Sequence, residues 1–207
     1  MTNTFNKLAL ISLVAGVTSG CGEKNEDETT ATTGTVFSKS YTLVTGTPTI
    51  AENSVSGTGT LNFADTLVTA RAEETNFLLT IDLSAGNDSF VALHSFANAD
   101  LTGGQVVTMG RGTDGSFAMQ YTKADGTSGT KTTFNETINA AASFTFSVEV
   151  HNGEDNGSHV IAWSGDAHSS SAAEATDGIY GAGKYTGLNF QNATITAFTV
   201  GAAEAAD

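Results

Sequence analysis

The stretch Phe144–Trp163, FTFSVEVHNGEDNGSHVIAW, gives the clearest indication of how this chain folds. Its first eight residues alternate between apolar and polar side chains, which is the period of a strand with one buried face. A polar turn follows at Asn152–Gly157, and a second apolar run then ends at Trp163. This order predicts two antiparallel strands joined by a turn, with the core side of the first formed by Phe144, Phe146, Val148 and Val150.

The same alternation recurs along most of the chain. Phe77–Leu83 and Phe117–Tyr121 show it most regularly, and Gly, Asn and Asp cluster between such segments, as they do in turns. No amphipathic helix is convincing, and Ser169–Thr176 is expected to be a loop. Many short strands at about ten-residue spacing predict one all-β domain, an antiparallel sandwich or barrel. The other predicted strands are Val36–Val44, Gly59–Phe63, Phe90–Phe96, Gln105–Gly110, Thr132–Asn135, His159–Trp163, Gly187–Phe190 and Ala193–Val200.

The order of these elements resembles concanavalin A-like jelly rolls of the laminin-G and legume-lectin kind. In those folds a late hairpin is followed by a "GL" segment and a closing strand. Here Phe144–Trp163 is followed by Gly187–Val200, GLNFQNATITAFTV. The resemblance runs from Phe77 to Val200 and implies an antiparallel β-sandwich of the jelly-roll type. Immunoglobulin-like and other jelly-roll sandwiches remain alternatives.

Length and charge exclude several classes of protein. The chain has 207 residues, with 22 acidic against 8 basic side chains and a net charge of −14. So acidic a protein repels a phosphate backbone, and we expect no nucleic-acid partner. The length suits one domain with a sizeable core. The composition excludes collagen, coiled-coil and multi-pass membrane classes.

Residues 1–20 have the features of a lipoprotein signal peptide. Lys7 precedes the apolar run Leu8–Val17, which is too short to span a bilayer but suits a signal-peptide core. The sequence Thr18-Ser19-Gly20-Cys21 resembles the lipobox of bacterial lipoproteins, which implies lipid attachment to the Cys21 thiol. Because Cys21 is the one cysteine, no intramolecular disulfide can form. An ordinary secretory signal with an unrelated cysteine is the alternative.

A polar segment separates this signal from the predicted strands. Gly22–Gly34 has no large apolar residue and four acidic ones, which predicts a disordered tether of about 20 Å. By resemblance to Gram-negative sorting rules, Gly22 after the cysteine favours the outer membrane, on its periplasmic side or at the cell surface. The expected organisation is a signal peptide over 1–20, the lipidated cysteine and tether over 21–34, the β-sandwich over 35–200 and a disordered tail over 201–207.

The catalytic motifs of sandwich enzymes are largely missing. Laminarinase-type glycosidases carry E-x-D-x-x-E on one strand, whereas Glu149 stands alone on its predicted strand. Alginate lyases of this fold carry three motifs, of which Ile179–Tyr185 echoes one. The histidines have neither metal-site nor triad spacing. We therefore favour a non-catalytic binding module. A carbohydrate-active lyase or glycosidase, or an envelope structural or adhesion protein, remains the alternative.

The binding hypothesis singles out residues in loops and at strand ends. Sugar rings stack on planar apolar faces, and amides or imidazoles bond their hydroxyl groups. The Gly-rich segment Gly178–Gly187 is expected to expose its two tyrosines. The negative charge favours a neutral glycan or a basic protein over an acidic polysaccharide. The candidate ligand-binding residues are Tyr180, Tyr185, Asn152, His151 and Trp163.

No organic cofactor is expected, and calcium is the ion that the sequence suits best. Calcium prefers six to eight oxygen ligands, which loop Asp, Asn and backbone carbonyl groups supply. The turn Asn152–Gly157 is rich in such groups, although it has no EF-hand register. The candidate ligands are Glu154, Asp155 and Asn156, and a solvated hairpin turn is the alternative.

Overall fold

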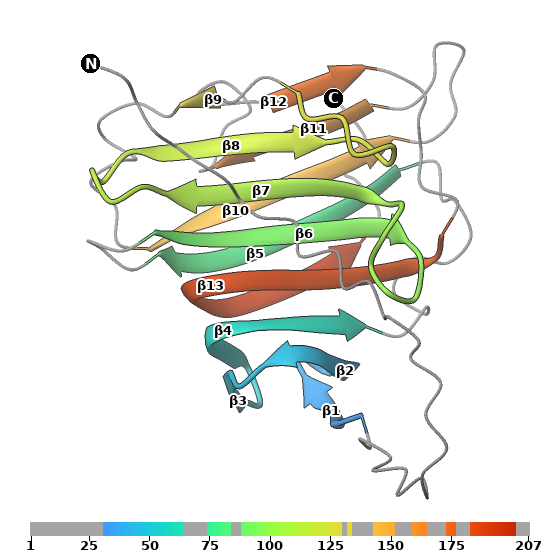
Figure 1. Cartoon of the computed structure of the whole chain (residues 1–207), viewed down its shortest axis with the longest axis vertical. Coiled ribbons are helices and arrows are strands. Elements are labelled where there is room, and N and C mark those ends of the chain that lie inside the picture. The colour runs from blue at the N-terminus through green and yellow to red at the C-terminus, as the bar shows by residue number, and fades with distance from the viewer. Residues whose placement is uncertain are drawn as a thin grey trace, which may run out of the picture. The chain divides into compact units, whose positions relative to one another are not determined.

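The chain is all-β in the part that the structure describes. The computed structural model describes residues 31–63, 74–83, 88–129, 132–133, 143–151, 159–164, 173–176 and 183–201. Their regular structure consists of 13 strands (Figure 1), which confirms the predicted class. Within these residues we find no helix with the length and apolar character needed to cross a membrane.

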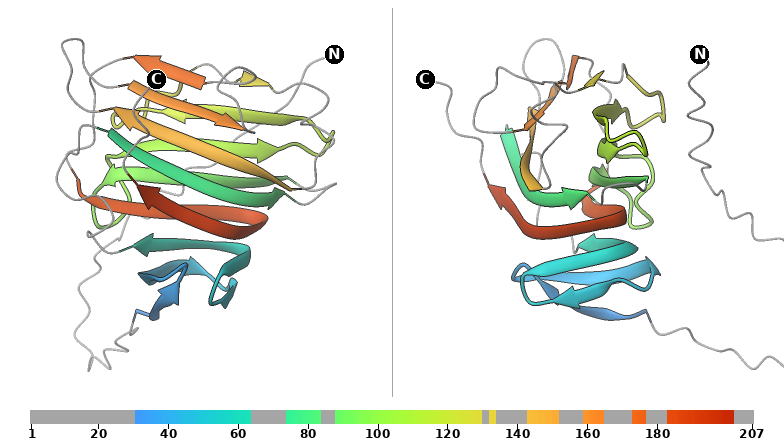
Figure 2. Two further views of the ribbon diagram at one scale, coloured as in Figure 1. Left: turned by 180° about the vertical axis from the view of Figure 1, so that it is seen from behind. Right: turned by 90° about the vertical axis from the view of Figure 1, so that its left-hand side faces the viewer.

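The strands form one continuous antiparallel sheet that folds over into two layers (Figure 2). In spatial order, the first layer contains β1 (Thr33–Val36), β2 (Lys39–Gly46), β4 (Ser54–Phe63), β13 (Tyr185–Gly201), β6 (Ser89–Ala97), β7 (Gln105–Arg111), β8 (Phe117–Thr122) and β9 (Thr132–Thr133). The second layer contains β3 (Thr49–Ala51), the other halves of β4 and β13, then β5 (Glu74–Leu83), β10 (Ser143–His151), β11 (His159–Ser164) and β12 (Ala173–Thr176).

Strand β13 belongs to both layers because it bends in the middle. Its first half pairs with β6 and with the second half of β4, while its second half pairs with β5 and with the first half of β4. A bulge separates the halves at Phe190/Ala193, where Asn192 has a positive φ of 48°. Bulges of this kind bend a strand sharply and increase its twist. The bend carries the chain from one layer to the other.

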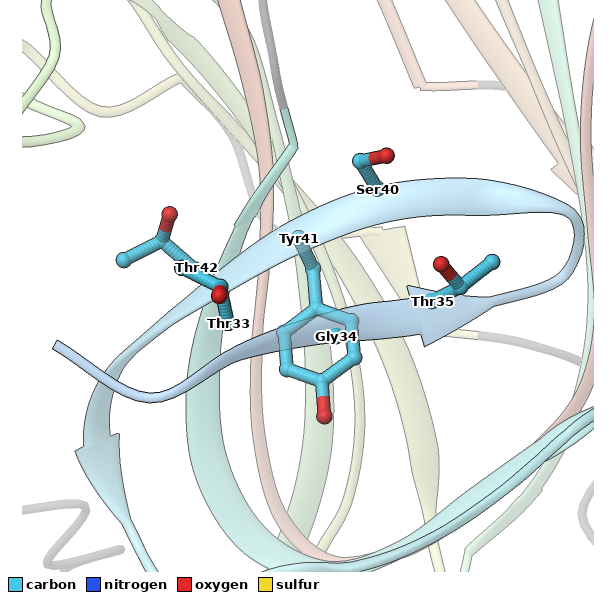
Figure 3. A pocket seen from close by; sticks show the side chains of 6 residues that line it. All are labelled: Thr33, Gly34, Thr35, Ser40, Tyr41 and Thr42. Atoms are coloured by element: carbon cyan, nitrogen blue, oxygen red, sulfur yellow. The ribbon is translucent and has the colours of Figure 1, made fainter.

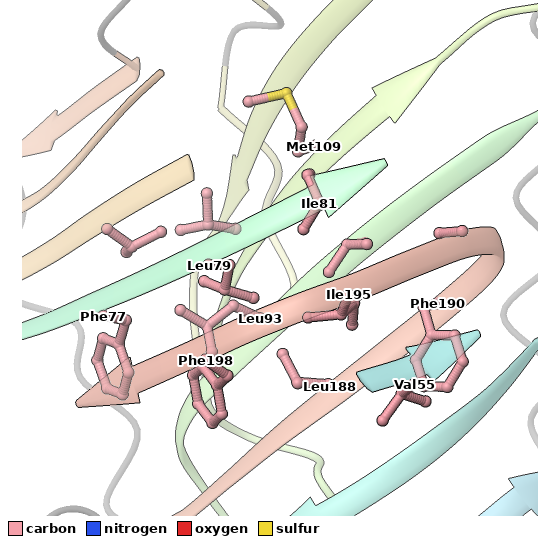
Figure 4. Close-up of a cluster of buried hydrophobic side chains, with 14 of the residues drawn as sticks. Val55, Phe77, Leu79, Ile81, Leu93, Met109, Leu188, Phe190, Ile195 and Phe198 are labelled. Atoms are coloured by element: carbon pink, nitrogen blue, oxygen red, sulfur yellow. The ribbon is translucent and has the colours of Figure 1, made fainter. Parts of the chain in front are cut away.

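The core lies between the layers and follows the predicted alternation (Figure 4). On β5, Phe77 and Leu79 are fully buried, whereas the intervening Leu78 is 41% exposed. Val148 of β10 is also fully buried, as its pattern predicted. The largest fully buried side chains come from both layers and include Phe63, Phe77, Phe117, Phe190, Leu61, Leu93 and Met109.

The structure corrects the prediction of a single strand over Val36–Val44. A tight turn at Phe37-Ser38 divides this region into β1 and β2, and the two residues have φ values of 53° and 59°. Two consecutive left-handed residues are the mark of the tight hairpin turn that matches strand twist. Phe37 is buried and packs edge-on against Phe198, with ring centroids 6.3 Å apart. The contact with Phe198 therefore explains why a bulky residue occupies a turn position that is usually taken by glycine.

We expect Ser38→Gly to stabilise the domain, because Ser38 is exposed and held in the left-handed region. Relief of that conformation is worth about 1–2 kcal/mol, and the added backbone freedom offsets about half of it, which leaves about 0.5–1 kcal/mol. Urea denaturation of the two proteins measures the difference. Ser40→Gly, at an exposed strand position of β2, is the matched control and should destabilise. A lower stability for Ser38→Gly would contradict the turn geometry.

Other boundaries also differ from the sequence predictions. The segments Gly187–Phe190 and Ala193–Val200 are parts of the one long strand β13. Ala173–Thr176, predicted to lie in a loop, forms β12 beside β11. The strand β3 was not predicted. Strand β1 starts at Thr33, two residues before the predicted start of the sandwich at residue 35.

Candidate functional site

The outward side of the first layer presents three rows of side chains that cross its strands. Strand register defines each row, and the residues that alternate with them, such as Leu61, Leu93 and Leu188, lie in the core. The strap row is Thr42, Asn62, Gly187, His94, Val106 and Thr122. The middle row is Thr45, Thr60, Asn189, Ala92, Thr108 and Gln120. The outer row is Gln191, Phe90, Gly110, Ala118 and Thr133.

The segment Asn98–Gly104, which we call the strap, covers part of the strap row. It connects β6 to β7 and crosses in front of β13 (Figure 1). Asn62 Nδ2 donates to the carbonyl oxygen of Ala99 at 2.5 Å, and the Leu101 side chain rests on Gly187. Leu101 is only 7% exposed. The strap therefore borders the middle and outer rows, and we call the surface formed by these two rows the trough.

A chain of hydroxyl groups orients the amide at the centre of the trough. Thr45 Oγ1 donates to Thr60 Oγ1 at 2.9 Å, and Thr60 Oγ1 donates to Asn189 Oδ1 at 3.4 Å. Since Oδ1 of Asn189 accepts from Thr60, its amide nitrogen is directed away from that contact as a donor. Three neighbouring strands thus fix one side chain in the middle row.

The far side of the middle row is fixed in a similar way. Gln120 Nε2 donates to the carbonyl oxygen of Gly129 at 3.1 Å, so its Oε1 is the group left to accept. Thr108, beside it on β7, is half-buried, and Ala92 forms a small floor between Thr108 and Asn189. At a strand spacing of about 4.8 Å, the row from Thr60 to Gln120 is about 19 Å long.

His94 adds an acceptor at the foot of the strap. Its Nδ1 donates to the carbonyl oxygen of Leu101 at 3.2 Å, which leaves Nε2 unprotonated in the neutral ring. Burial lowers the pKa of His94 below its ordinary 6.5, and the hydrogen bond to Leu101 opposes that shift in part. The ring is therefore neutral at pH 7.

The outer row contributes an aromatic ring. Phe90 is half-buried on the outward side of β6, between the small residues Gly110 and Ala118 and the side chain of Gln191. Gln191 Nε2 and Asn192 Nδ2 both donate to the carbonyl oxygen of Asp88, at 3.3 Å and 3.0 Å. These bonds tie the bend of β13 to the start of β6 beneath the ring.

The chemistry of the trough is that of uncharged donors and acceptors around one aromatic ring. Hydroxyl and amide groups suit a ligand rich in hydroxyl groups. The three rows carry no Asp, Glu, Lys or Arg side chain. Among the residues that the structure describes, no three His, Cys, Asp or Glu side chains gather closely enough to hold a metal ion.

A hollow of about 420 Å³ lies on the β1–β2 hairpin (Figure 3). Hydroxyl side chains supply its polar groups, and the phenol of Tyr41 lies so close to Gly34 that a side chain there would meet it at 2.6 Å. This hollow lacks the amides of the trough. Its lining is Thr33, Gly34, Thr35, Ser40, Tyr41 and Thr42.

Solved structures share the arrangement of the two layers. A legume lectin-like domain from Entamoeba histolytica covers 79% of this chain and 90% of its own, with a TM-score of 0.54 and 11% identity. A Bacillus licheniformis β-glucanase covers 76% and 82%, with a TM-score of 0.50 and 8% identity. A CBM2 module of the Lactobacillus casei BL23 phage J-1 evolved Dit covers 75% and 79%, with a TM-score of 0.53 and 4% identity.

The fold is a concanavalin A-like jelly roll. This confirms the fold that the order of the strands predicted. No protein-family description matches the sequence. No curated protein resembles it in sequence either. At such low sequence identities, similarity to solved structures establishes the fold alone. Function has to be inferred from the residues of this chain.

The described part of the chain contains three of the binding residues that the sequence singled out. Tyr185 is half-buried at the start of β13, opposite Ala97, so the strap lies between it and Asn189. His151 ends β10 opposite Glu74, and Trp163 lies in β11 opposite Ser147, both in the second layer. The other named residues lie outside the described part of the chain, namely Cys21, Tyr180, Asn152, Glu154, Asp155 and Asn156.

Sequence reasoning missed the residues that line the trough. Thr60, Asn189, Thr108 and Gln120 are ordinary outward positions of predicted or partly predicted strands. The alternation itself could have identified them as solvent-facing. Their alignment into one row depends on strand order, which the sequence does not display.

Proposed function

We propose that this protein is a saccharide-binding module that does not turn its ligand over, and that the trough is its binding site. The observation that carries the proposal is the set of pre-positioned uncharged groups around Phe90, above all the Asn189 amide held by Thr60. Such groups bond sugar hydroxyls, and the ring gives a sugar face an apolar surface.

The fold adds support of a weaker kind. The three similar structures are a lectin-like domain, a CBM2 module and a β-glucanase. Proteins with this architecture are thus named for carbohydrate binding or cleavage. Because fold does not determine function, the proposal rests on the residues of the trough, and the similar structures are secondary support.

The charge of the chain narrows the proposed ligand. The protein has a net charge of −14, and the rows of the trough carry no basic side chain to attract an anion. An acidic polysaccharide is repelled by such a protein. We therefore propose a neutral glycan, with a basic protein as the second class of ligand.

Binding of the purified full chain to a glycan array tests the proposal directly. We expect retention of neutral oligosaccharides and no release of new reducing ends from them. Parallel measurements with added calcium and with a chelator test whether the segment that contains Glu154, Asp155 and Asn156 supplies ligands to a calcium ion. An array without any retained neutral glycan, in either arm, contradicts the proposed function.

Catalysis is the alternative that the β-glucanase likeness favours. A retaining glycosidase needs two carboxyl groups about 5–5.5 Å apart. The rows of the trough supply none, so an enzyme would use acidic residues elsewhere in the chain. Production of new reducing ends from a bound glycan would favour this alternative over binding alone.

We further propose that the protein is a lipoprotein of the outer membrane, attached through Cys21 and held off the lipid by the acidic tether. The lipobox-like Thr18-Ser19-Gly20-Cys21 supports the anchor, and Gly22 supports the outer membrane. Several acyl chains on one residue give a stable attachment, whereas one chain gives a marginal attachment.

Cys21→Ser is expected to abolish lipid attachment, because only the thiol forms the thioether bond. The variant should retain residues 1–20 and should be absent from the detergent-extracted membrane fraction. The native protein should have a greater mass than the unmodified mature chain. Intact-mass spectrometry and fractionation measure both effects. Cys21→Ala is a second variant with the same expectation, and an unmodified Cys21 in the native protein would refute the anchor.

A further inference from the structure

The strap combines an unusual backbone conformation with an incompletely satisfied polar contact. Leu101 has a positive φ of 62°. Residues other than glycine rarely adopt this conformation, and they keep it only where surrounding contacts impose it. Two hydrogen bonds within the strap support this conformation, because the Asn98 N–H donates to the Thr102 carbonyl oxygen at 2.8 Å and the Leu101 N–H donates to the Asn98 carbonyl oxygen at 2.9 Å.

The polar groups beneath the strap are incompletely satisfied. Asn62 is only 8% exposed, and while its Nδ2 donates to Ala99, its Oδ1 is buried without a hydrogen-bond partner. A buried acceptor that lacks a partner destabilises the state in which it is buried. Opening of the strap would return this oxygen to water or offer it to a ligand.

Three contacts hold the strap on the sheet, and the first is the bond from Asn62 Nδ2 to the Ala99 carbonyl oxygen. The Leu101 side chain is buried on Gly187, where the absence of a Cβ makes room for it, since an added Cβ would overlap Leu101. The carbonyl oxygen of Leu101 also accepts from His94 Nδ1. Leu101 is thus the residue whose position distinguishes a closed strap from an open one.

His94 is the titratable group under the strap. The described elements around it contribute few charges: Asp100 on the strap is exposed, and the neighbours across β13 and β7 are Gly187 and Val106. Asp100 bonds Thr102 through Oδ1, at 3.1 Å to the amide nitrogen and 2.6 Å to the hydroxyl oxygen. Protonation of His94 would place a positive charge on a buried ring, which burial disfavours.

We propose that the strap is an acid-released lid, which opens when His94 is protonated and exposes Asn62, Gly187 and His94 as an extension of the trough. An open strap lets water solvate the charged ring and frees Asn62 Oδ1. The lid is a property of the fold alone. Its role as an extension of the trough rests on the proposed saccharide binding.

The direction of the pH effect follows from the burial of His94. Its pKa in the closed state lies below the ordinary value of 6.5, and in the open state it returns toward that value. The open state therefore binds the proton more tightly, and its population rises as the pH falls below 6.5. Above that pH the ring is neutral in both states and the closed strap is retained.

Methyl NMR of the full chain between pH 7.5 and 4.5 tests the lid. We expect the Leu101 methyl resonances to move in one transition that coincides with the titration of the His94 ring. The variant His94→Asn keeps a donor near Nδ1 but does not titrate, so its Leu101 resonances should stay constant. Titration of His94 without any change at Leu101 would overturn the proposal.

A second variant opens the strap without acid. Gly187→Ala removes the space for Leu101, so we expect the open-state resonances at pH 7.5. Gly201→Ala, in the same strand but with open space around it, is the control and should resemble the parent protein. A closed-state spectrum for Gly187→Ala would also overturn the lid.

Glycan binding separates the two proposals. If the parent protein retains a neutral oligosaccharide, Gly187→Ala should change the Kd of that oligosaccharide by at least about fivefold at pH 7.5. The reason is that the open strap makes the binding site longer. A Leu101 transition without glycan binding would refute the proposed function and leave the lid. Glycan binding with an immobile Leu101 would refute the lid and leave the proposed function.

Discussion

Phe198→Ala is expected to destabilise the domain by about 3–5 kcal/mol, the usual cost of removing a large aromatic side chain from a core. Phe198 is 2% exposed, and its ring lies 5.2 Å from that of Phe63 and 6.3 Å from that of Phe37. Lys39 Nζ lies over the same ring at 5.8 Å. The ring thus connects the second half of β13 to the β1–β2 hairpin and to β4.

Urea denaturation measures the effect, with Thr199→Ala as the control because Thr199 is the exposed neighbour in the same strand. If Phe198→Ala does not fold, Phe198→Leu keeps most of the volume and should still lower the midpoint clearly. A midpoint for Phe198→Leu equal to that of the parent would mean that this part of the core is not packed as described.

Asn189→Ala is expected to weaken glycan binding by about 1–3 kcal/mol, which is roughly 5- to 150-fold in Kd. The substitution removes the amide that Thr60 orients, and it leaves the Thr60 hydroxyl without that acceptor. Isothermal titration with an oligosaccharide retained on the array measures the change.

Two controls separate a lost contact from a lost fold. Thr194→Ala lies in the same strand beyond the bend, on the second layer opposite Asp82, and should bind as the parent does. The urea midpoint of Asn189→Ala should also stay close to that of the parent, because Asn189 is only half-buried. Unchanged affinity of Asn189→Ala would remove the trough as the site.

Most of the strands were predictable because their side chains alternate strictly. Phe77–Leu83 in β5 and Phe117–Tyr121 in β8 show this period, and the turns at Asp114-Gly115 and Asp125-Gly126 have the residues that turns favour. The turn at Phe37-Ser38 has no such residue, since tertiary packing of Phe37 determines its geometry. It was therefore not predicted.

The site was harder to predict than the fold. The trough takes one or two residues from each of seven strands, and its order, β2, β4, β13, β6, β7, β8 and β9, differs from their order along the chain. No local motif marks Asn189 or Gln120. The strap was equally hard to predict, because Gly187 makes room for Leu101, which lies more than eighty positions away in the sequence.

The central position of β13 has a consequence for the time at which this protein can fold. In the described pairings, β1 to β4 form one group of strands, β6 to β9 a second, and β5 with β10, β11 and β12 a third. Among the described strands, only β13 is paired with all three groups, and it is synthesised after the other twelve. Until it emerges, its neighbours lack their common partner, and such long-range pairing is slow. For a chain that we propose is exported, this delay keeps the polypeptide extended long enough to be threaded through a translocation channel.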